Sequence, residues 1–122
     1  MGYESRFYVV NKLGSYKNDK NDLYYGEKIA IFNMCKVYKL YDVIKNYPKT
    51  DTFIYADDGN TLITEDKYGQ PLIEIPINDM IYHLRNVIDN DTHYRRYEPF
   101  LHLLLGFNTR EWENLVVLHY GY

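Results

Sequence analysis

The chain has 122 residues, 46% of them hydrophobic and 25% charged, which excludes an intrinsically disordered protein and fits one domain over 1–122. Its net charge of −3 lacks the basic excess that is typical of nucleic-acid-binding proteins. Because no apolar run approaches the roughly 20 residues that span a bilayer and no secretory signal is recognisable, we expect a cytoplasmic protein without a membrane partner.

Two strands and a short helix are predicted in the first part of the chain. Residues 5–13 and 24–37 are rich in strand-forming residues. The polar segment between them is too short for a crossover helix, so we expect the two strands to pair antiparallel. Apolar residues between Leu40 and Tyr47 recur at helical spacing, and Pro48 marks the end of this predicted helix.

Three further short strands are predicted in the middle of the chain, over 52–56, 61–66 and 71–75. The segments between them, 57–60 and 67–70, each contain a glycine that can adopt the positive φ of a tight turn. This pattern predicts a three-stranded meander with hairpin turns of ordinary length.

Two helices and a final strand are predicted in the remainder of the chain. A stripe of apolar residues predicts a helix from about Asn78 that ends near Asn90, and a second helix is expected over 96–105. The inward side chains of this second helix are expected to be Leu101, Leu104 and Leu105. A single helical turn around Trp112 precedes residues 115–118, which are apolar on both faces and therefore predict a central strand.

Together these elements predict an α+β fold, with two or three helices packed on one face of an antiparallel sheet of about five or six strands. Charge is unevenly distributed along this fold, because residues 51–79 carry a net charge of −6. The chain also has 15 tyrosines, a residue type that is enriched at protein interfaces. These features predict an acidic, tyrosine-rich surface that binds a protein partner, although acidic turns that serve only solubility are the alternative. The residues expected to contact the partner are Asp57, Asp58, Glu65, Asp66 and Tyr68.

Three segments carry a resemblance to known proteins: the opening MGYESRFYVV, the turn YADDGN at 55–60 and the closing LVVLHYGY at 115–122. In these segments the sequence resembles small orphan proteins of phages and prophages of Gram-positive bacteria. That group includes inhibitors of host defence, notably anti-CRISPR proteins. The resemblance implies a phage-type inhibitor or modulator that occupies the surface of a host protein, such as a CRISPR-associated nuclease or another nucleic-acid-handling protein.

A small nucleic-acid-binding module is the alternative function, and it depends on one compact basic and aromatic cluster. Guanidinium groups can bind phosphates and tyrosine rings can stack on bases. The cluster consists of Tyr94, Arg95, Arg96 and Tyr97. It could equally be a solvent-exposed helix start or part of a protein interface.

No recognisable signature of catalysis or metal binding is present. The four histidines do not have metal-site spacing, and Asp79 and His83, which share a helix face, could supply only two ligands. The one cysteine, Cys35, lies in a predicted strand and excludes an internal disulfide. A small hydrolase or deaminase-like enzyme would need a motif that the chain lacks. We therefore expect no enzymatic activity, no catalytic residue, no cofactor and no bound metal.

Overall fold

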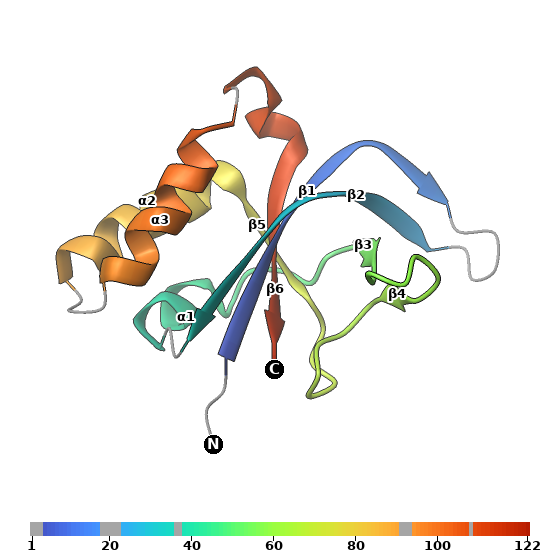
Figure 1. The fold of residues 1–122 in the computed structure, drawn as a ribbon, viewed down its shortest axis with the longest axis horizontal. Helices are drawn as coiled ribbons and strands as arrows, with labels where there is room; N and C mark the ends of the chain where they lie inside the picture. The colour runs from blue at the N-terminus through green and yellow to red at the C-terminus, as the bar shows by residue number, and fades with distance from the viewer. Residues whose placement is uncertain (1–3, 18–22, 36–37, 91–93, 108) are drawn as a thin grey trace.

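The computed structural model describes residues 4–17, 23–35, 38–90, 94–107 and 109–122. Its elements in chain order are β1 (Glu4–Lys17), β2 (Tyr24–Cys35), α1 (Tyr38–Ile44), β3 (Thr52–Tyr55), β4 (Leu62–Ile63), β5 (Ile73–Pro76), α2 (Ile77–Asn90), α3 (Tyr94–Leu105), the 3₁₀ helix η1 (Thr109–Asn114) and β6 (Leu115–Gly121). Figure 1 shows the three α-helices on one side of a strongly curved sheet and the β3–β4 hairpin on the other side.

The six strands are arranged in the order β4-β3-β2-β1-β6-β5. The predicted α+β fold, with its strand and helix numbers, is therefore confirmed, and so is the antiparallel pairing of β1 with β2. One pairing differs from the expected antiparallel sheet, because β2 and β3 run parallel. The physical reason is the connection between them, since the chain after β2 passes through α1 and returns to the start of β2 as a crossover.

The predicted three-stranded meander is wrong in its third strand. β3 and β4 form the expected antiparallel hairpin, but β5 pairs with β6 at the opposite end of the sheet. The segment between β4 and β5 instead crosses the face of the sheet that is turned away from the helices, where Leu72 is buried together with Tyr8 and Leu118. The second turn closes with an isolated antiparallel bridge between Glu65 and Pro71, but burial of these apolar side chains outweighs its extension into a second hairpin.

The helices cover one face of β1, and the β3–β4 hairpin with the segment that follows it covers the other. Phe7 and Val9 belong to the larger core, which the helices complete. Tyr8 and Val10 belong to the smaller core, which includes Ile54 of β3 and Leu72. This alternation follows from the period of two along a strand. It also explains β6, which lies between β1 and β5 and is buried on both faces, as its apolar sequence predicts.

The buried stripe of α3 is displaced from the predicted one. Tyr97, Phe100 and Leu104 are buried, while Leu105 is exposed and Leu101 is only half-buried. The aromatic rings determine this rotation, because Phe100 stacks on Phe32 with ring centroids 5.0 Å apart and an interplanar angle of 11°. Large aromatic side chains bury more area than leucine and so take precedence in the core. Within the described residues, no helix has the length and apolar character needed to cross a membrane.

Candidate functional site

The acidic residues of the β3–β4 turn interact with neighbouring groups of the fold. Asp57 is almost fully exposed (92%) and forms an ion pair with Lys28 of β2 at 3.0 Å. Asp58 accepts hydrogen bonds from the backbone N–H groups of Asn60 and Thr61, both at 2.9 Å, and from the Thr61 hydroxyl at 2.7 Å. These hydrogen bonds lower the pKa of Asp58 and make it a turn-stabilising residue.

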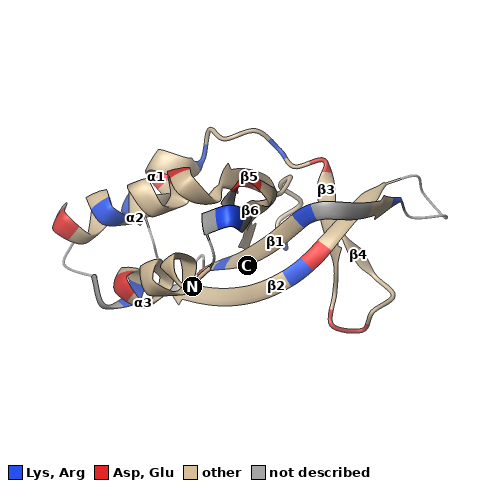
Figure 2. Cartoon of the chain, turned by 90° about the horizontal axis from the view of Figure 1, so that it is seen from above, with Lys and Arg blue, Asp and Glu red and all other residues tan. Residues whose placement is uncertain are grey.

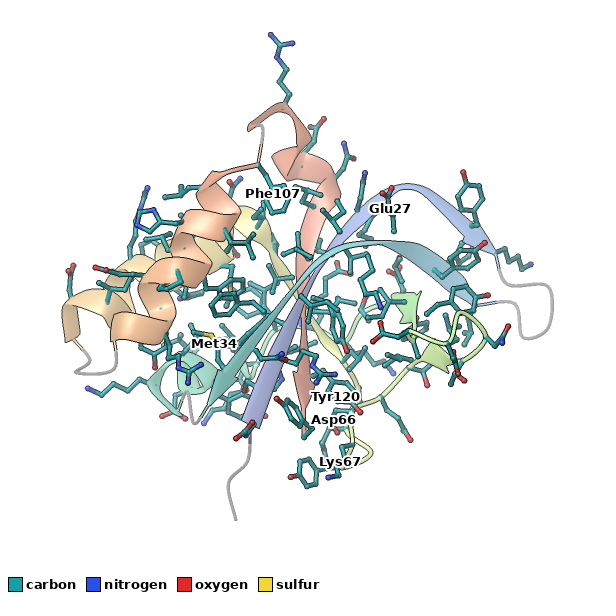
Figure 3. All side chains as sticks on the ribbon, viewed as in Figure 1. Glu27, Met34, Asp66, Lys67, Phe107 and Tyr120 are labelled. Carbon is teal, nitrogen blue, oxygen red and sulfur yellow. The ribbon has the colours of Figure 1, made fainter. Side chains whose placement is uncertain are left out.

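The second acidic turn lies apart from the first. Asp66, predicted as a contact residue, is buried and accepts hydrogen bonds from the backbone N–H groups of Tyr68 and Gln70, so it offers little surface to a partner. Its carboxylate has the same turn-stabilising function as that of Asp58. Glu65 and Tyr68 are exposed. Because the N–H of Lys67 bonds to the carbonyl of Gly121, this turn lies at the end of β6 (Figure 3), whereas the first turn connects β3 with β4 (Figure 1).

The predicted acidic contacts therefore do not form one continuous surface. Figure 2 shows acidic positions spread over the helices, β2 and the hairpin. The alternative cluster at the start of α3 is also not assembled as expected. Tyr97 is buried in the core and cannot stack on a base, while Arg96 is exposed. The side chains of Tyr94 and Arg95 lie outside the described residues.

A basic and aromatic cluster does exist, but it is built by the ends of the chain. The guanidinium of Arg6 lies over the ring of Tyr122 at 4.7 Å and over that of Tyr120 at 6.0 Å. The ammonium of Lys28 lies 5.9 Å from the ring centroid of Tyr8. Antiparallel pairing of β1 with β6 places Arg6 opposite Tyr120. Cations over aromatic faces of this kind are attracted by the ring quadrupole.

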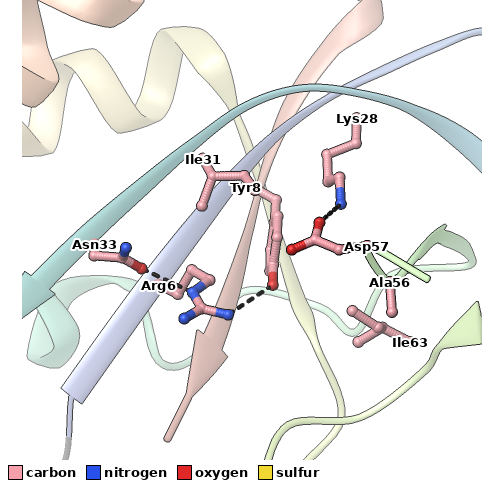
Figure 4. A pocket seen from close by; sticks show the side chains of 8 residues that line it. All are labelled: Arg6, Tyr8, Lys28, Ile31, Asn33, Ala56, Asp57 and Ile63. Carbon is pink, nitrogen blue, oxygen red and sulfur yellow. Dashed lines mark hydrogen bonds and ion pairs between the residues drawn. The ribbon is translucent and has the colours of Figure 1, made fainter. Parts of the chain in front are cut away.

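This cluster borders a pocket of about 250 Å³, which we call the Arg6–Lys28 pocket (Figure 4). β1 and β2 form one wall, and the β3–β4 hairpin forms the other. The lining residues are Arg6, Tyr8, Lys28, Ile31, Asn33, Ala56, Asp57 and Ile63. Two cations and one carboxylate give this lining a net charge of +1.

The polar groups of the pocket hold one another in place. The Arg6 Nε donates to Asn33 Oδ1 at 2.7 Å, and its Nη1 approaches the Tyr8 hydroxyl at 3.4 Å. The interaction with Tyr8 raises the pKa of Arg6, so the guanidinium stays charged. Lys28 Nζ donates to the carbonyl of Tyr55 at 3.2 Å as well as to Asp57. The two cations are thus positioned before any ligand arrives.

One border of the pocket is an open sheet edge. β2 pairs with β3 only where Tyr24 and Tyr25 lie opposite Thr52 and Phe53, and the two strands then separate. Ile29 has no partner in the β1 register, which marks a β-bulge. Beyond the bulge, no strand among the described residues pairs with the outer side of residues 30–34, and β2 runs along the border of the molecule in Figure 2. We call residues 30–34 the open edge.

A second polar pocket, of about 260 Å³, contains His119 and Asp66. The His119 Nε2 lies 2.8 Å from the Ser5 hydroxyl, as in a serine nucleophile and its base. Burial lowers the pKa of His119 to about 4, partly opposed by the charge of Asp66, so the imidazole is neutral at pH 7. Ser5, however, is 1% exposed and does not line the pocket, so a substrate cannot reach its hydroxyl.

The pair Asp79 and His83 faces a tyrosine. The Tyr47 hydroxyl donates to Asp79 Oδ2 at 3.0 Å and lies 2.8 Å from His83 Nε2. Burial, followed by the hydrogen bond to Asp79, raises the pKa of Tyr47 to about 12. Within the part of the chain that is described, no three His, Cys, Asp or Glu side chains are grouped to hold a metal ion.

Of the residues that line the Arg6–Lys28 pocket, sequence reasoning identified only Asp57. The available signal was the alternation of Arg6 with Tyr8 in the first strand and of Tyr120 with Tyr122 in the last, which places each pair on one face of a sheet. Only the β1–β6 pairing brings the two pairs together.

Comparison of the chain with protein-family models, with curated proteins and with solved structures found no match.

Proposed function

We propose that the chain is a binding protein and that an extended segment of a partner protein joins its sheet at the open edge of β2. A sheet edge presents alternating backbone N–H and C=O groups, and an extended peptide can satisfy them by adding a strand. The open edge includes the exposed Ile31. This edge, bordered by a polar pocket, is the observation that supports the proposal.

The position of the pocket fits strand addition. Ile31 and Asn33 lie opposite Tyr8 and Arg6 in the β1 register, and all four line the Arg6–Lys28 pocket. A strand added next to β2 would occupy the space where β2 and β3 separate. Every second side chain of that strand would then point toward the pocket, because side chains alternate between the faces of a sheet. Backbone hydrogen bonds would supply affinity, and the pocket would supply specificity.

A peptide is a better match for this surface than a nucleic acid is. The backbone groups of a sheet edge complement another peptide backbone, and the pocket carries a net charge of only +1. The Ser5 hydroxyl, which lies beside His119, is buried where a substrate cannot reach it, and this supports a binding function over a catalytic one. The resemblance to phage inhibitors supports a host protein as the partner. Of the predicted contact residues, Asp57 alone lines this pocket.

The variant Ile31→Lys tests strand addition. Ile31 is 42% exposed, so the variant should fold, but a lysine within an edge strand opposes pairing with another strand. The tagged wild-type protein is used to capture partners from a bacterial lysate, and mass spectrometry identifies them. The purified partner is then titrated calorimetrically, and we expect the variant to bind at least about tenfold more weakly, which is about 1.4 kcal/mol.

Val43→Lys is the matched control, because Val43 of α1 is 45% exposed and also β-branched but lies outside the pocket and the edge. Its affinity should equal that of the wild type. Amide hydrogen exchange supplies an independent measurement, since a bound strand should protect amides within residues 30–34. Equal affinity of the wild type and Ile31→Lys, or unchanged exchange at residues 30–34 in the complex, would show that strand addition is wrong.

A further inference from the structure

We infer that the Arg6–Lys28 pocket receives the carboxylate of a glutamate in the segment that joins β2. This inference rests on the proposed function, because it assigns a ligand group to the pocket beside the open edge. Two cations from adjacent strands line it, Arg6 of β1 and Lys28 of β2. Hydrogen bonds from guanidinium and ammonium groups to carboxylates are about twice as strong as bonds between neutral groups.

Asp57 already places a carboxylate beside Lys28 in the lining of the pocket. It contacts Lys28 at 3.0 Å although 92% of its side chain is exposed to solvent. Exposed ion pairs of this kind contribute little to stability, so an incoming carboxylate can displace Asp57 from Lys28 at small cost. Arg6 is held separately by Asn33 and keeps further N–H donors for the ligand.

The shape and charge of the pocket favour glutamate. Ile31, Ala56 and Ile63 provide an apolar part of the lining, which suits the two methylene groups of a glutamate side chain. The net charge of +1 balances one carboxylate. A phosphate group would carry a larger negative charge close to Asp57, which would oppose its binding.

Selection from a peptide library tests this inference and does not require the partner to be identified. A library of random nine-residue peptides is selected against the wild-type protein, and bound peptides are mapped by hydrogen exchange. We expect the enriched peptides to have β-branched residues at alternate positions and to contain a glutamate. A synthetic peptide and its Glu→Gln version are then titrated against the wild type and Lys28→Gln. The glutamate peptide should bind about tenfold more tightly to the wild type, and this difference should shrink in Lys28→Gln.

Two further variants separate the pocket from general charge effects. Lys45→Gln is the matched control, because Lys45 also forms an exposed ion pair, with Asp42 at 3.5 Å, but lies outside this pocket. It should leave the preference for glutamate unchanged. Asp57→Asn removes the competing carboxylate, and it should tighten binding of the glutamate peptide about two- to threefold. If Asp57 instead belonged to an acidic surface that contacts a basic partner, Asp57→Asn would weaken binding.

The outcomes distinguish the inference from the proposed function. If peptides bind at the open edge and Ile31→Lys weakens them, but glutamate and glutamine peptides bind equally, the inference is wrong and strand addition stands. If no selected peptide protects residues 30–34, the proposed function and the inference both fail. A single-stranded oligonucleotide that binds the wild type and not Lys28→Gln would identify the pocket as a phosphate site, which would also overturn the inference.

Discussion

Replacing His119 by glutamine should flatten the pH dependence of stability between pH 6.5 and pH 4. In the folded protein, burial lowers the pKa of His119 from 6.5 to about 4. The unfolded chain therefore binds a proton in this range that the folded protein does not, so stability falls as the pH falls. At about 1.4 kcal/mol per unit of pKa difference, His119 should account for a loss of about 3 kcal/mol.

Urea-induced unfolding, followed by circular dichroism at pH 7, 6, 5 and 4, measures this effect. Glutamine keeps a hydrogen-bonding side chain next to the Ser5 hydroxyl, which lies 2.8 Å from His119 in the wild type, but it does not titrate. The free energy of unfolding should fall between pH 7 and pH 4 by about 3 kcal/mol less in His119→Gln than in the wild type. The comparison between proteins removes the contribution of carboxylates that both share.

His102→Gln is the control, because it makes the same substitution at an exposed position of α3, outside the core. The wild type and His102→Gln are expected to have parallel pH profiles. If His119→Gln loses as much stability between pH 7 and pH 4 as the wild type does, then His119 is not held neutral by burial, and the reasoning is refuted.

Three substitutions test the packing of the core and the sheet, each by urea unfolding at pH 7. Phe100→Ala removes a fully buried ring and should cost about 3–5 kcal/mol, and a loss below 1 kcal/mol would contradict the packing described for α3. Gly26→Ala would place a Cβ atom 2.7 Å from Val10 Cγ1 and should cost about 1–3 kcal/mol, so unchanged stability would argue against this close approach. Glu74→Gln weakens the ion pair with Lys12, which measures 3.1 Å, and should cost about 1 kcal/mol; a stabilised variant would contradict it.

Much of the fold follows from local patterns in the sequence. The β1–β2 hairpin, the helix from Ile77 and the interior position of β6 were all predictable, because each depends on hydrophobic periodicity within one segment. The position of β5 was not predictable in this way. The preceding turn favours a hairpin with β4, whereas the pairing with β6 depends on apolar side chains from distant parts of the chain, such as Tyr8 and Leu118.

The candidate site was less predictable than the fold, because its residues are far apart in the sequence. Charge density along the chain identified Asp57, but it did not show that Lys28 neutralises it. Charge density also predicted Asp66 as a contact residue. It did not show that this carboxylate is buried and accepts hydrogen bonds from the backbone of its own turn. The compact cluster at 94–97 was predicted from proximity in the sequence, yet helical geometry places Tyr97 in the core.

The alternation of side chains along β1 has a consequence for experiments. Arg6 and Tyr8 line the Arg6–Lys28 pocket, while the intervening Phe7 belongs to the helical core on the opposite face. A ligand that binds only the folded protein raises its stability as the ligand concentration rises above the dissociation constant. Because one strand carries both sets of side chains, occupancy of the pocket should delay melting of helices that the ligand never touches. Thermal shift measurements could therefore screen ligands of this pocket without a label.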